Sequence, residues 1–334
     1  MKIGIALMCC LGALLPLAAT SQPSVVVPTA QAAERSLGDW LTRMHEASRA
    51  RAYVGTFVVS SGSSMSSARI WHVCDGEQQM ERIETLTGTP RATFRRNDQV
   101  VTFYPDTRVA VAERRESLGW FPNRLLSADA AMARYYALQA LGNARVAGVE
   151  TDVVHLQPRD GLRYAYRIWA EKKSGLVVKL QTRSADGQVL EQAAFSELQI
   201  DAPVSMARLA VMMAATEGYQ VQRPDRVKTS PEAVGWALKT AVPGFESTAV
   251  YLRPAAAGEV RRDDTVQWIF SDGLATVSLF IEPFDPRRHA QTELPASGPT
   301  QMLMRRVVDH WLTAVGEVPV ATLSAFAQAL ERRK

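Results

Sequence analysis

The chain has 334 residues, of which 47 % are hydrophobic and 22 % are charged. This composition excludes a disordered tail, a collagen-like repeat and a bundle of membrane spans. Its 38 Lys and Arg residues against 34 Asp and Glu residues give a net charge of +4, a small excess of mixed charge that argues against nucleic acid as the partner. At about 100 to 200 residues per domain, the length predicts two domains.

The N-terminus has the pattern of a secretory signal peptide. Lys2 precedes an apolar stretch, and Ala30-Gln31-Ala32 offers the small residues that a signal peptidase requires. We therefore expect cleavage after Ala32, removal of residues 1–32 and a periplasmic mature protein. A retained membrane anchor is the weaker alternative because the apolar stretch is short for a span. Cys74 is the one cysteine after the signal, so we expect no intrachain disulfide.

The mature chain begins with a predicted helix over residues 36–50, for which Ser36 is the expected N-cap. Period-two stretches from Tyr53 to Ala112 then predict an antiparallel meander. A second helix is predicted over Ser127–Leu141, and strands resume from Arg145 to Leu198. The fold class is therefore mainly β (α+β), with a curved sheet or open barrel covered by helices over residues 33–200.

The hairpin pattern stops after residue 200. The Met-rich and Pro-containing segment 201–224 is expected to be a linker. Residues 225–334 are expected to form a smaller C-terminal α+β domain. Its predicted elements are strands near Ala249–Arg253, Thr265–Phe270 and Ala275–Ile281, and a closing helix in which Leu323, Phe326 and Leu330 share a face.

No pattern of catalytic or metal-binding residues stands out in the sequence. The five histidines are far apart, and the sequence has no nucleophile elbow, no phosphate-binding loop and no dinucleotide fingerprint. Ser271-Asp272-Gly273 is read as a hairpin turn rather than part of a hydrolase site. We therefore predict that the protein is not an enzyme and has no cofactor and no metal site. A hydrolase with residues dispersed along the chain is an open alternative.

The strands of the first domain instead predict an apolar pocket that would suit an acyl chain. Aromatic side chains alternate along them, with Tyr164 and Tyr166 on one face of a strand and Trp169 on the other. Arginines nearby suit an anionic head group. The lipid-pocket candidates are Phe57, Trp71, Tyr164, Tyr166 and Trp169, and the head-group candidates are Arg82, Arg91 and Arg95. Each aromatic ring could equally fill the core.

Several long strings resemble one protein family. They are YVGTFVV, ARIWHVCDGEQQMERIETLTGTPR, RYAYRIWAEKKSGLVVKLQTRSADGQVLEQAAFSEL, SDGLATVSLFIEP and AVGEVPVATLSAFAQAL. They are similar to the RseB/MucB family of periplasmic regulators of the extracytoplasmic-stress sigma factor, over nearly the whole mature chain. The resemblance implies a binding protein without enzymatic activity, whose larger domain is similar to the open barrel of the lipoprotein carriers LolA and LolB.

The resemblance also implies the partners. The family binds the periplasmic part of a membrane anti-sigma factor, RseA or MucA, and shields it from the site-1 protease. Lipid-like signals, notably lipopolysaccharide, are implied to release it. Candidate partner contacts in the second domain are Trp268, Phe270, Phe280 and Phe284. A periplasmic lipid or lipoprotein carrier of LolA type is the alternative function, and a homo-oligomeric state is left open.

Overall fold

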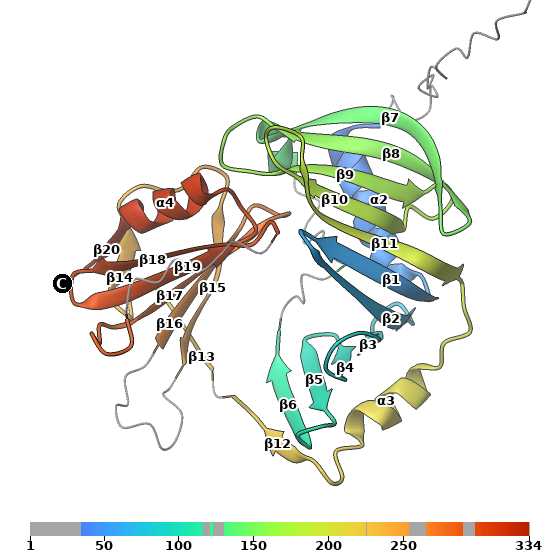
Figure 1. Cartoon of the computed structure of the whole chain (residues 1–334), viewed down its shortest axis with the longest axis horizontal. Helices are drawn as coiled ribbons and strands as arrows, with labels where there is room; N and C mark the ends of the chain where they lie inside the picture. Colours follow the sequence, from blue (N-terminus) through green and yellow to red (C-terminus); the bar gives the residue numbers. More distant parts are fainter. Residues whose placement is uncertain are drawn as a thin grey trace, which may run out of the picture.

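The computed structural model describes residues 35–115, 121–122, 130–224, 226–253, 265–289 and 298–333. The predicted signal peptide, residues 1–32, lies outside the described residues. The protein folds as a large β domain followed by a smaller one that combines a sheet with a helix (Figure 1). The predicted fold class, mainly β with an open sheet and a smaller α+β domain, is confirmed. No helix of the described segments is long and apolar enough to cross a membrane.

The first sheet has twelve strands in the order β12-β6-β5-β4-β3-β2-β1-β11-β10-β9-β8-β7. Neighbouring strands are antiparallel except β12 and β6, which are parallel. The alternating pattern from Tyr53 onward therefore gives the predicted meander. The strands are β1 Tyr53–Ser61, β2 Ser64–Cys74, β3 Gln79–Thr85, β4 Ala92–Arg96, β5 Gln99–Tyr104, β6 Val109–Arg114, β7 Tyr136–Val146, β8 Val149–Pro158, β9 Ala165–Glu171, β10 Val177–Arg183, β11 Val189–Ile200 and β12 Gln220–Gln222.

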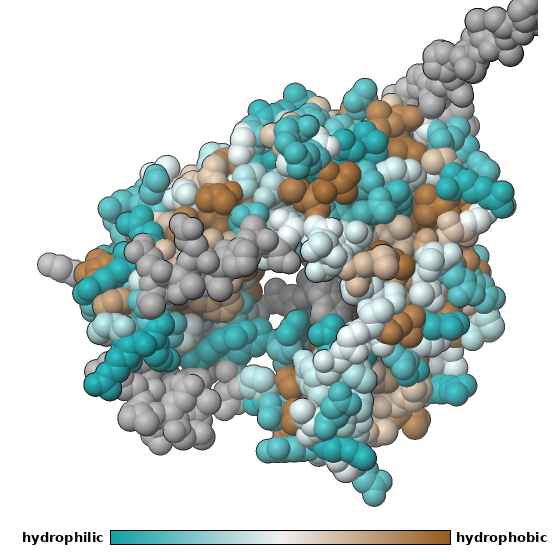
Figure 2. Space-filling view, viewed as in Figure 1, coloured by the Kyte–Doolittle hydropathy of each residue, from teal (hydrophilic) through white to brown (hydrophobic). Residues whose placement is uncertain are grey.

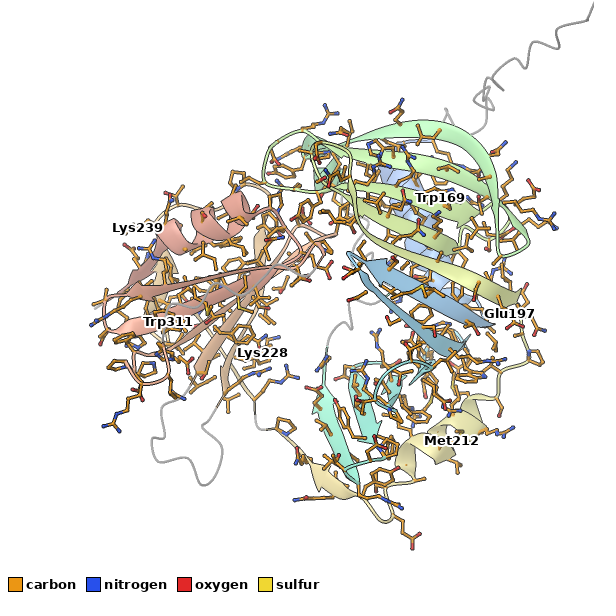
Figure 3. The ribbon with its side chains drawn as sticks, viewed as in Figure 1. Trp169, Glu197, Met212, Lys228, Lys239 and Trp311 are labelled. Carbon is orange, nitrogen blue, oxygen red and sulfur yellow. The ribbon has the colours of Figure 1, made fainter. Side chains whose placement is uncertain are left out.

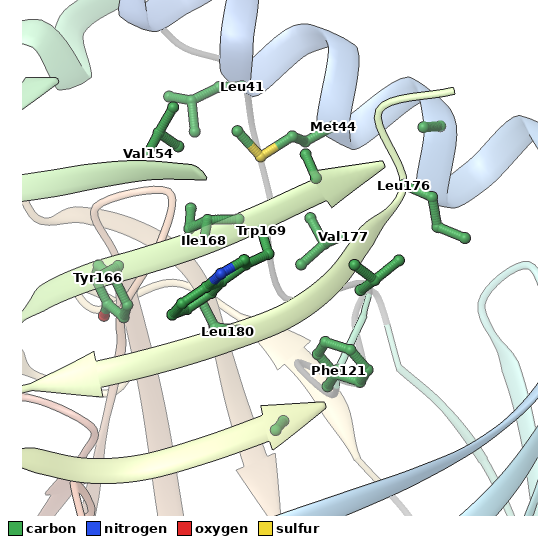
Figure 4. Close-up of a cluster of buried hydrophobic side chains, with 14 of the residues drawn as sticks. Leu41, Met44, Phe121, Val154, Tyr166, Ile168, Trp169, Leu176, Val177 and Leu180 are labelled. Atoms are coloured by element: carbon green, nitrogen blue, oxygen red, sulfur yellow. The ribbon is translucent and has the colours of Figure 1, made fainter. Parts of the chain in front are cut away.

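The predicted first helix is confirmed as α2, Leu37–Ala50. Ser36 is its N-cap and forms a capping box with Asp39, which satisfies backbone N–H groups at the helix start. Trp40, Leu41 and Met44 are fully buried against one face of the first sheet, here called the inner face. Figure 4 shows Leu41 and Met44 above strands β9 and β10. Burial of each such side chain stabilises the fold by about 1.5–3 kcal/mol.

The helix predicted over Ser127–Leu141 is wrong where the structure describes that segment. A short 3-10 helix, Ala130–Arg134, leads directly into strand β7. The residues from Tyr136 onward have good intrinsic helix propensity, but pairing with β8 along its whole length overrides it. Gly142, directly after the predicted helix, lies at a register shift in this pair, with a φ of 91°. The shift accommodates the curvature of the sheet edge.

The segment predicted as a linker, residues 201–224, folds onto the first sheet. It contains α3, Met206–Ala214, whose N-cap is Ser205, and it ends in strand β12. Leu209 of α3 is buried against the outer face of the sheet, opposite α2, in a cluster with Met80 and Phe94. The chain therefore crosses to the second domain only after β12.

The second domain has a six-stranded sheet in the order β13-β15-β16-β17-β19-β18. Helix α4, Val320–Ala329, covers one face, where Leu323 and Phe326 are fully buried. The three central predicted strands and the closing helix are confirmed, whereas the hairpin of β18 and β19 is not anticipated by the sequence. The strands are β13 Val227–Thr229, β15 Glu246–Arg253, β16 Thr265–Ser271, β17 Thr276–Pro283, β18 Gln301–Val307 and β19 His310–Gly316, with the pair β14 Trp236–Leu238 and β20 Leu330–Arg332.

Candidate functional site

A cavity of about 480 Å³, here called the inner pocket, lies on the inner face of the first sheet. Strands β1, β3, β10 and β11 contribute alternate residues to it, because side chains that share a face recur every two positions. Strand β2 contributes the consecutive residues Ser66, Ser67 and Ala68. Its apolar lining is Phe57, Val59, Ala68, Ile83, Phe121, Leu180 and Ala193. The pocket is therefore an uncovered part of the same face that α2 buries farther along.

Polar residues surround the apolar part of the inner pocket. Hydroxyl groups come from Ser66 and Ser67 and from several threonines, and Arg91 adds a cation. Glu191 and Glu317 add carboxylates, and Glu317 belongs to the second domain, directly after β19. An amphipathic molecule with an apolar chain and a polar end fits this lining chemically. Any occupant of the pocket would also touch the second domain through Glu317.

The structure separates the predicted lipid-pocket residues. Phe57 lines the inner pocket, whereas Trp71 lies on the outer face of β2, in the cluster under α3. Tyr164 hydrogen-bonds Gln301 of the second domain, and burial raises its pKa. Tyr166 packs in the main core beside Tyr136, with ring centroids 6.2 Å apart. Trp169 points to the opposite face of β9 from Tyr166, where the Nζ of Lys179 lies 4.6 Å from the ring centroid.

The predicted head-group arginines are also divided. Arg91 lines the inner pocket. Arg82 stacks on Trp71, 4.7 Å from the ring centroid, and pairs with Glu84 at 2.6 Å on the outer side of the sheet. Arg95 donates from Nε to the backbone oxygen of Asn97 at 2.6 Å. The pocket thus holds one of the three cations.

A buried ion pair joins the two domains. Arg163, just before β9, donates from Nε to the carboxylate of Asp272 at 2.8 Å, and both side chains are 0 % exposed. The other two guanidinium nitrogens donate to Asp160 and to the backbone oxygen of Pro243, each at 2.6 Å. Tyr136 donates to the same Asp272 oxygen at 3.1 Å. Each of the three guanidinium nitrogens therefore has a protein acceptor.

Local sequence explains why Asp272 occupies this position. The predicted turn at Ser271-Asp272-Gly273 is confirmed: the Asp272 carboxylate accepts from the backbone N–H groups of Leu274 and Ala275. The turn inserts Leu274 into the main core of the first domain. Gly244, with a φ of 77°, passes so close to Arg163 that a Cβ there would lie 2.2 Å from the guanidinium. Burial and the neighbouring Tyr166 and Asp272 together raise the pKa of Tyr136.

The aromatic candidates of the second domain divide between the two faces of its sheet. Trp268 and Phe270 pack in the core under α4, and Phe270 stacks near Phe326 at 4.7 Å between ring centroids. Phe280 lies half-buried on the other face, with Arg253 over its ring. Phe284, also half-buried, packs near Trp311 at 5.9 Å between ring centroids. Phe280 and Phe284 therefore remain accessible to a partner, unlike the other two.

A second cavity, here called the charged groove, has a volume of about 710 Å³. Its lining comes from β5 and β6 of the first domain, from the connection after β12, and from β13 and β15 of the second domain. Figure 2 shows the molecule hollowed between the two domains, and Figure 3 shows Lys228 on the side of the second domain that faces the first. The two domains therefore meet at the buried ion pair of Arg163 and Asp272, and they also face each other across the charged groove.

Both domains match models of known families. The model of the MucB/RseB N-terminal domain matches residues 36–213, and that of the MucB/RseB C-terminal domain matches residues 230–331. The chain belongs to the MucB/RseB family. Together the two matches span almost all of the described residues, so the predicted family resemblance is confirmed.

Curated relatives extend this family match over nearly the whole chain. The chain is 29 % identical over 314 residues to the sigma factor AlgU regulatory protein MucB of Pseudomonas aeruginosa, covering 92 % of this chain and 93 % of the relative. It is 21 % identical over 295 residues to the sigma-E factor regulatory protein RseB of Escherichia coli K12, covering 88 % and 90 %. Both MucB/RseB relatives are named as sigma factor regulatory proteins.

Solved structures of MucB have the same fold. MucB in complex with MucA(peri) superposes with a TM-score of 0.68 at 26 % identity, covering 90 % of this chain and 100 % of that chain. A crystal structure of MucB without a named partner gives a TM-score of 0.62 at 25 % identity, covering 91 % and 99 %. The two-domain arrangement of this chain is therefore similar to that of MucB as a whole.

Sequence reasoning missed the residues that join the domains. Arg163 and Asp272 are 109 positions apart, and nothing in either local pattern indicates that they meet. Glu317, the second-domain residue on the inner pocket, was also missed. Asp272 was recognised only for its turn. An arginine placed between a turn and an apolar strand is the one signal that marks Arg163 as a buried cation in need of a carboxylate.

Proposed function

We propose that this protein is a periplasmic regulator of an envelope-stress sigma factor, which binds the periplasmic part of a membrane anti-sigma factor of the RseA/MucA type. The observation that carries the proposal is the similarity to MucB from its complex with MucA(peri), because it extends over both domains and all of that chain. A lipid or lipoprotein carrier would have no use for the second domain and its buried link to the first.

The regulator acts by occlusion rather than by chemistry. A protease must bind its substrate as an extended strand, so a segment of the anti-sigma factor held against this protein is withheld from cleavage. Phe280 and Phe284 supply aromatic contact area on the face of the second sheet away from α4. Such aromatic residues commonly anchor interfaces. Binding at this face requires no catalytic group, in accord with a non-enzymatic role.

We further propose that the inner pocket receives the acyl chain of a lipid that signals envelope damage. Phe57 and the neighbouring apolar residues would contact the chain, and Arg91 would contact an anionic head group. Release of the partner follows if the lipid-bound form holds the anti-sigma factor less tightly, and the partner must then weaken lipid binding by the same factor. Glu317 offers a direct route, because it places the second domain at the pocket.

Protease protection tests the regulatory role. The purified periplasmic segment of the cognate anti-sigma factor is incubated with its site-1 protease, with and without this protein. We expect protection at stoichiometric amounts. Phe280→Ser and Phe284→Ser should weaken protection, whereas Met65→Ser, at a residue that is 75 % exposed near the start of β2, should not. Full cleavage in the presence of excess protein, without a detectable complex, would rule out the regulatory role.

A pocket-filling variant separates the regulator from the carrier. Ala193→Phe places a ring in the inner pocket, whereas Ala207→Phe adds the same ring to the exposed side of α3. Under the proposal, Ala193→Phe still protects the anti-sigma factor but no longer releases it when an acylated envelope lipid is added. If the protein instead carries lipid without ever binding the anti-sigma factor, the carrier function replaces the proposed one.

A further inference from the structure

Three cations, Arg167, Lys179 and Arg183, project from the outer face of strands β9 and β10 and are here called the outer cluster. Arg167 of β9 lies directly opposite Gln181 of β10, and Lys179 and Arg183 lie two positions before and after Gln181. Side chains two positions apart share a face, whereas Leu180, between Lys179 and Gln181, lines the inner pocket on the other face. The outer cluster is therefore a separate feature from the inner pocket.

No carboxylate among the described residues pairs with a cation of the outer cluster. The Nε of Arg167 is buried without a hydrogen-bond partner. The Nζ of Lys179 lies 4.6 Å from the ring centroid of Trp169, and Arg183 donates from Nη2 to the backbone oxygen of Gly187 at 2.6 Å. Neither the ring nor the carbonyl carries a negative charge, so these contacts hold the cations in place without neutralising them.

The half-buried cations of the outer cluster also destabilise one another. Burial and then Arg183 lower the pKa of Arg167, and burial and then Arg167 lower the pKa of Lys179. In both cases the charged form is less favourable than it is in water. Two carboxylates close by in the chain are placed elsewhere: Asp186 accepts from a hydroxyl group within its own turn, and Glu191 lines the inner pocket. An anion that joined the cations would remove this cost.

We propose that the outer cluster binds a phosphate-type oxyanion, either free or as the phosphate group of a larger molecule. The planar guanidinium groups of Arg167 and Arg183 present paired donors that match the oxygens of phosphate, and Lys179 adds an ammonium group. His155 of β8 lies directly opposite Arg167, and its Nδ1 is buried without a partner, so it adds a donor when a proton is on that nitrogen. Three cations around one position favour a polyvalent anion over a single carboxylate.

Calorimetric titration of the full mature chain with inorganic phosphate tests the site, with chloride used to hold the ionic strength constant. We expect saturable binding of a single phosphate per chain and a Tm that rises with phosphate concentration. Arg167→Gln should weaken phosphate binding at least about tenfold. It should not lower the Tm measured without phosphate, because it removes a cation that no described carboxylate pairs with. Arg69→Gln, at an exposed arginine of β2 directly opposite Glu84, is the matched control.

Gln181→Glu tests the same site by placing a carboxylate at its centre. Gln181 lies opposite Arg167 and between Lys179 and Arg183 on its own strand, so the new carboxylate occupies the position proposed for the oxyanion. We expect the variant to bind phosphate at least about tenfold more weakly and to have a higher Tm than the unmodified protein without phosphate. Gln139→Glu, at an exposed residue one strand beyond β8 on the same face, should have neither effect.

Three results would overturn the proposal. They are the absence of saturable binding, an affinity that neither Arg167→Gln nor Gln181→Glu changes, and equal affinity for succinate, which would assign the outer cluster to carboxylates instead. The proposed regulatory function is independent of these outcomes, because the outer cluster contributes neither to the inner pocket nor to the aromatic face of the second sheet.

Vesicles identify the source of the phosphate. Binding to phosphatidylglycerol but not to phosphatidylcholine vesicles, competed by inorganic phosphate and weakened by Gln181→Glu, assigns a lipid headgroup. Phosphate binding without vesicle binding assigns a soluble ligand.

Discussion

The two domains meet in two physically different ways. At the buried contact, the side chains of Arg163 and Asp272 are 0 % exposed and every nitrogen of the guanidinium has an acceptor. At the charged groove, the side chains of the ion pair Arg226 and Glu113 are 14 % and 10 % exposed, and the lining carries charges of both signs. The buried contact favours one geometry, because separating Arg163 from Asp272 would leave a charge that is neither paired nor hydrated. The second is hydrated, so water and ions can adjust to changes there.

The buried contact and the charged groove therefore have different effects on the arrangement of the two domains. A buried ion pair contributes little net stability compared with an apolar replacement, but it penalises every arrangement in which its partners separate. The buried contact therefore specifies how the second domain sits on the first, and it brings Glu317 to the inner pocket. The groove lacks that constraint, so a change in ionic strength alters the interactions there more easily.

Asp272→Asn should have the largest effect. An asparagine keeps an oxygen for the turn, but it points an NH2 group at the buried Nε of Arg163 and leaves Arg163 paired with Asp160, whose side chain is 30 % exposed. We therefore expect a loss of about 3–4 kcal/mol of unfolding free energy. Urea denaturation measures it. Asp201→Asn is the matched control, because Asp201 pairs with Arg51 at 3.2 Å on the surface, and its loss should cost less than about 1 kcal/mol. Equal losses in the two variants would contradict the distinction between dry and hydrated pairs.

Gly244→Ala tests how tightly the buried contact is packed. The new Cβ would lie 2.2 Å from the Arg163 guanidinium and 2.7 Å from the Tyr135 ring, so overpacking adds to the strain of a positive φ and we expect a cost of about 3 kcal/mol. Gly76→Ala carries the strain alone, because φ is 96° there and nothing lies within 4 Å, and should cost about 1 kcal/mol. The difference between their denaturation midpoints measures the clash. A difference near zero would mean that the contact yields easily.

The pH dependence of stability extends the comparison to a dry polar group inside the first domain. Burial, and to a lesser extent Arg95, lower the pKa of His72 to about 4, while its Nδ1 hydrogen-bonds the Arg51 carbonyl at 2.8 Å. The unfolded chain takes up a proton near pH 6.5, whereas the folded protein does not until about pH 4. Its contribution is therefore complete above pH 6.5 and is lost as pH falls, by about 2 kcal/mol at pH 5.

Urea denaturation at pH 7.5 and pH 5 measures this loss. In His72→Gln the part due to His72 should disappear, so the variant should lose about 2 kcal/mol less than the unmodified protein between the two pH values. His45→Gln is the control, since His45 is a half-buried histidine of α2 whose Nε2 lies 3.4 Å from Nη1 of Arg49. If the unmodified protein and both variants lose the same stability between pH 7.5 and pH 5, protonation of His72 does not cause the loss.

Features of the fold and of the candidate site could be predicted from the sequence where they depend on contacts between residues close in the chain. Alternation and turn residues indicate the strands because both are local. They do not tell which face is inner. Ile70 is buried in one apolar cluster and Trp71 is partly buried in another, because α2 covers one face and α3 the other. Tyr136 illustrates the opposite failure, where helix-like spacing was overridden by pairing with β8. The site residues contributed by the second domain depend on contacts between distant segments, which carry no local pattern.

Glu113→Gln should have the smallest effect on stability and the greatest dependence on conditions. It removes the carboxylate shared by Arg226 and Arg115, so we expect a loss of about 1 kcal/mol at low ionic strength, which shrinks as salt screens the remaining cations. Denaturation at two salt concentrations measures this dependence. A loss of stability that salt does not reduce would mean that the groove, like the contact at Asp272, is closed to ions.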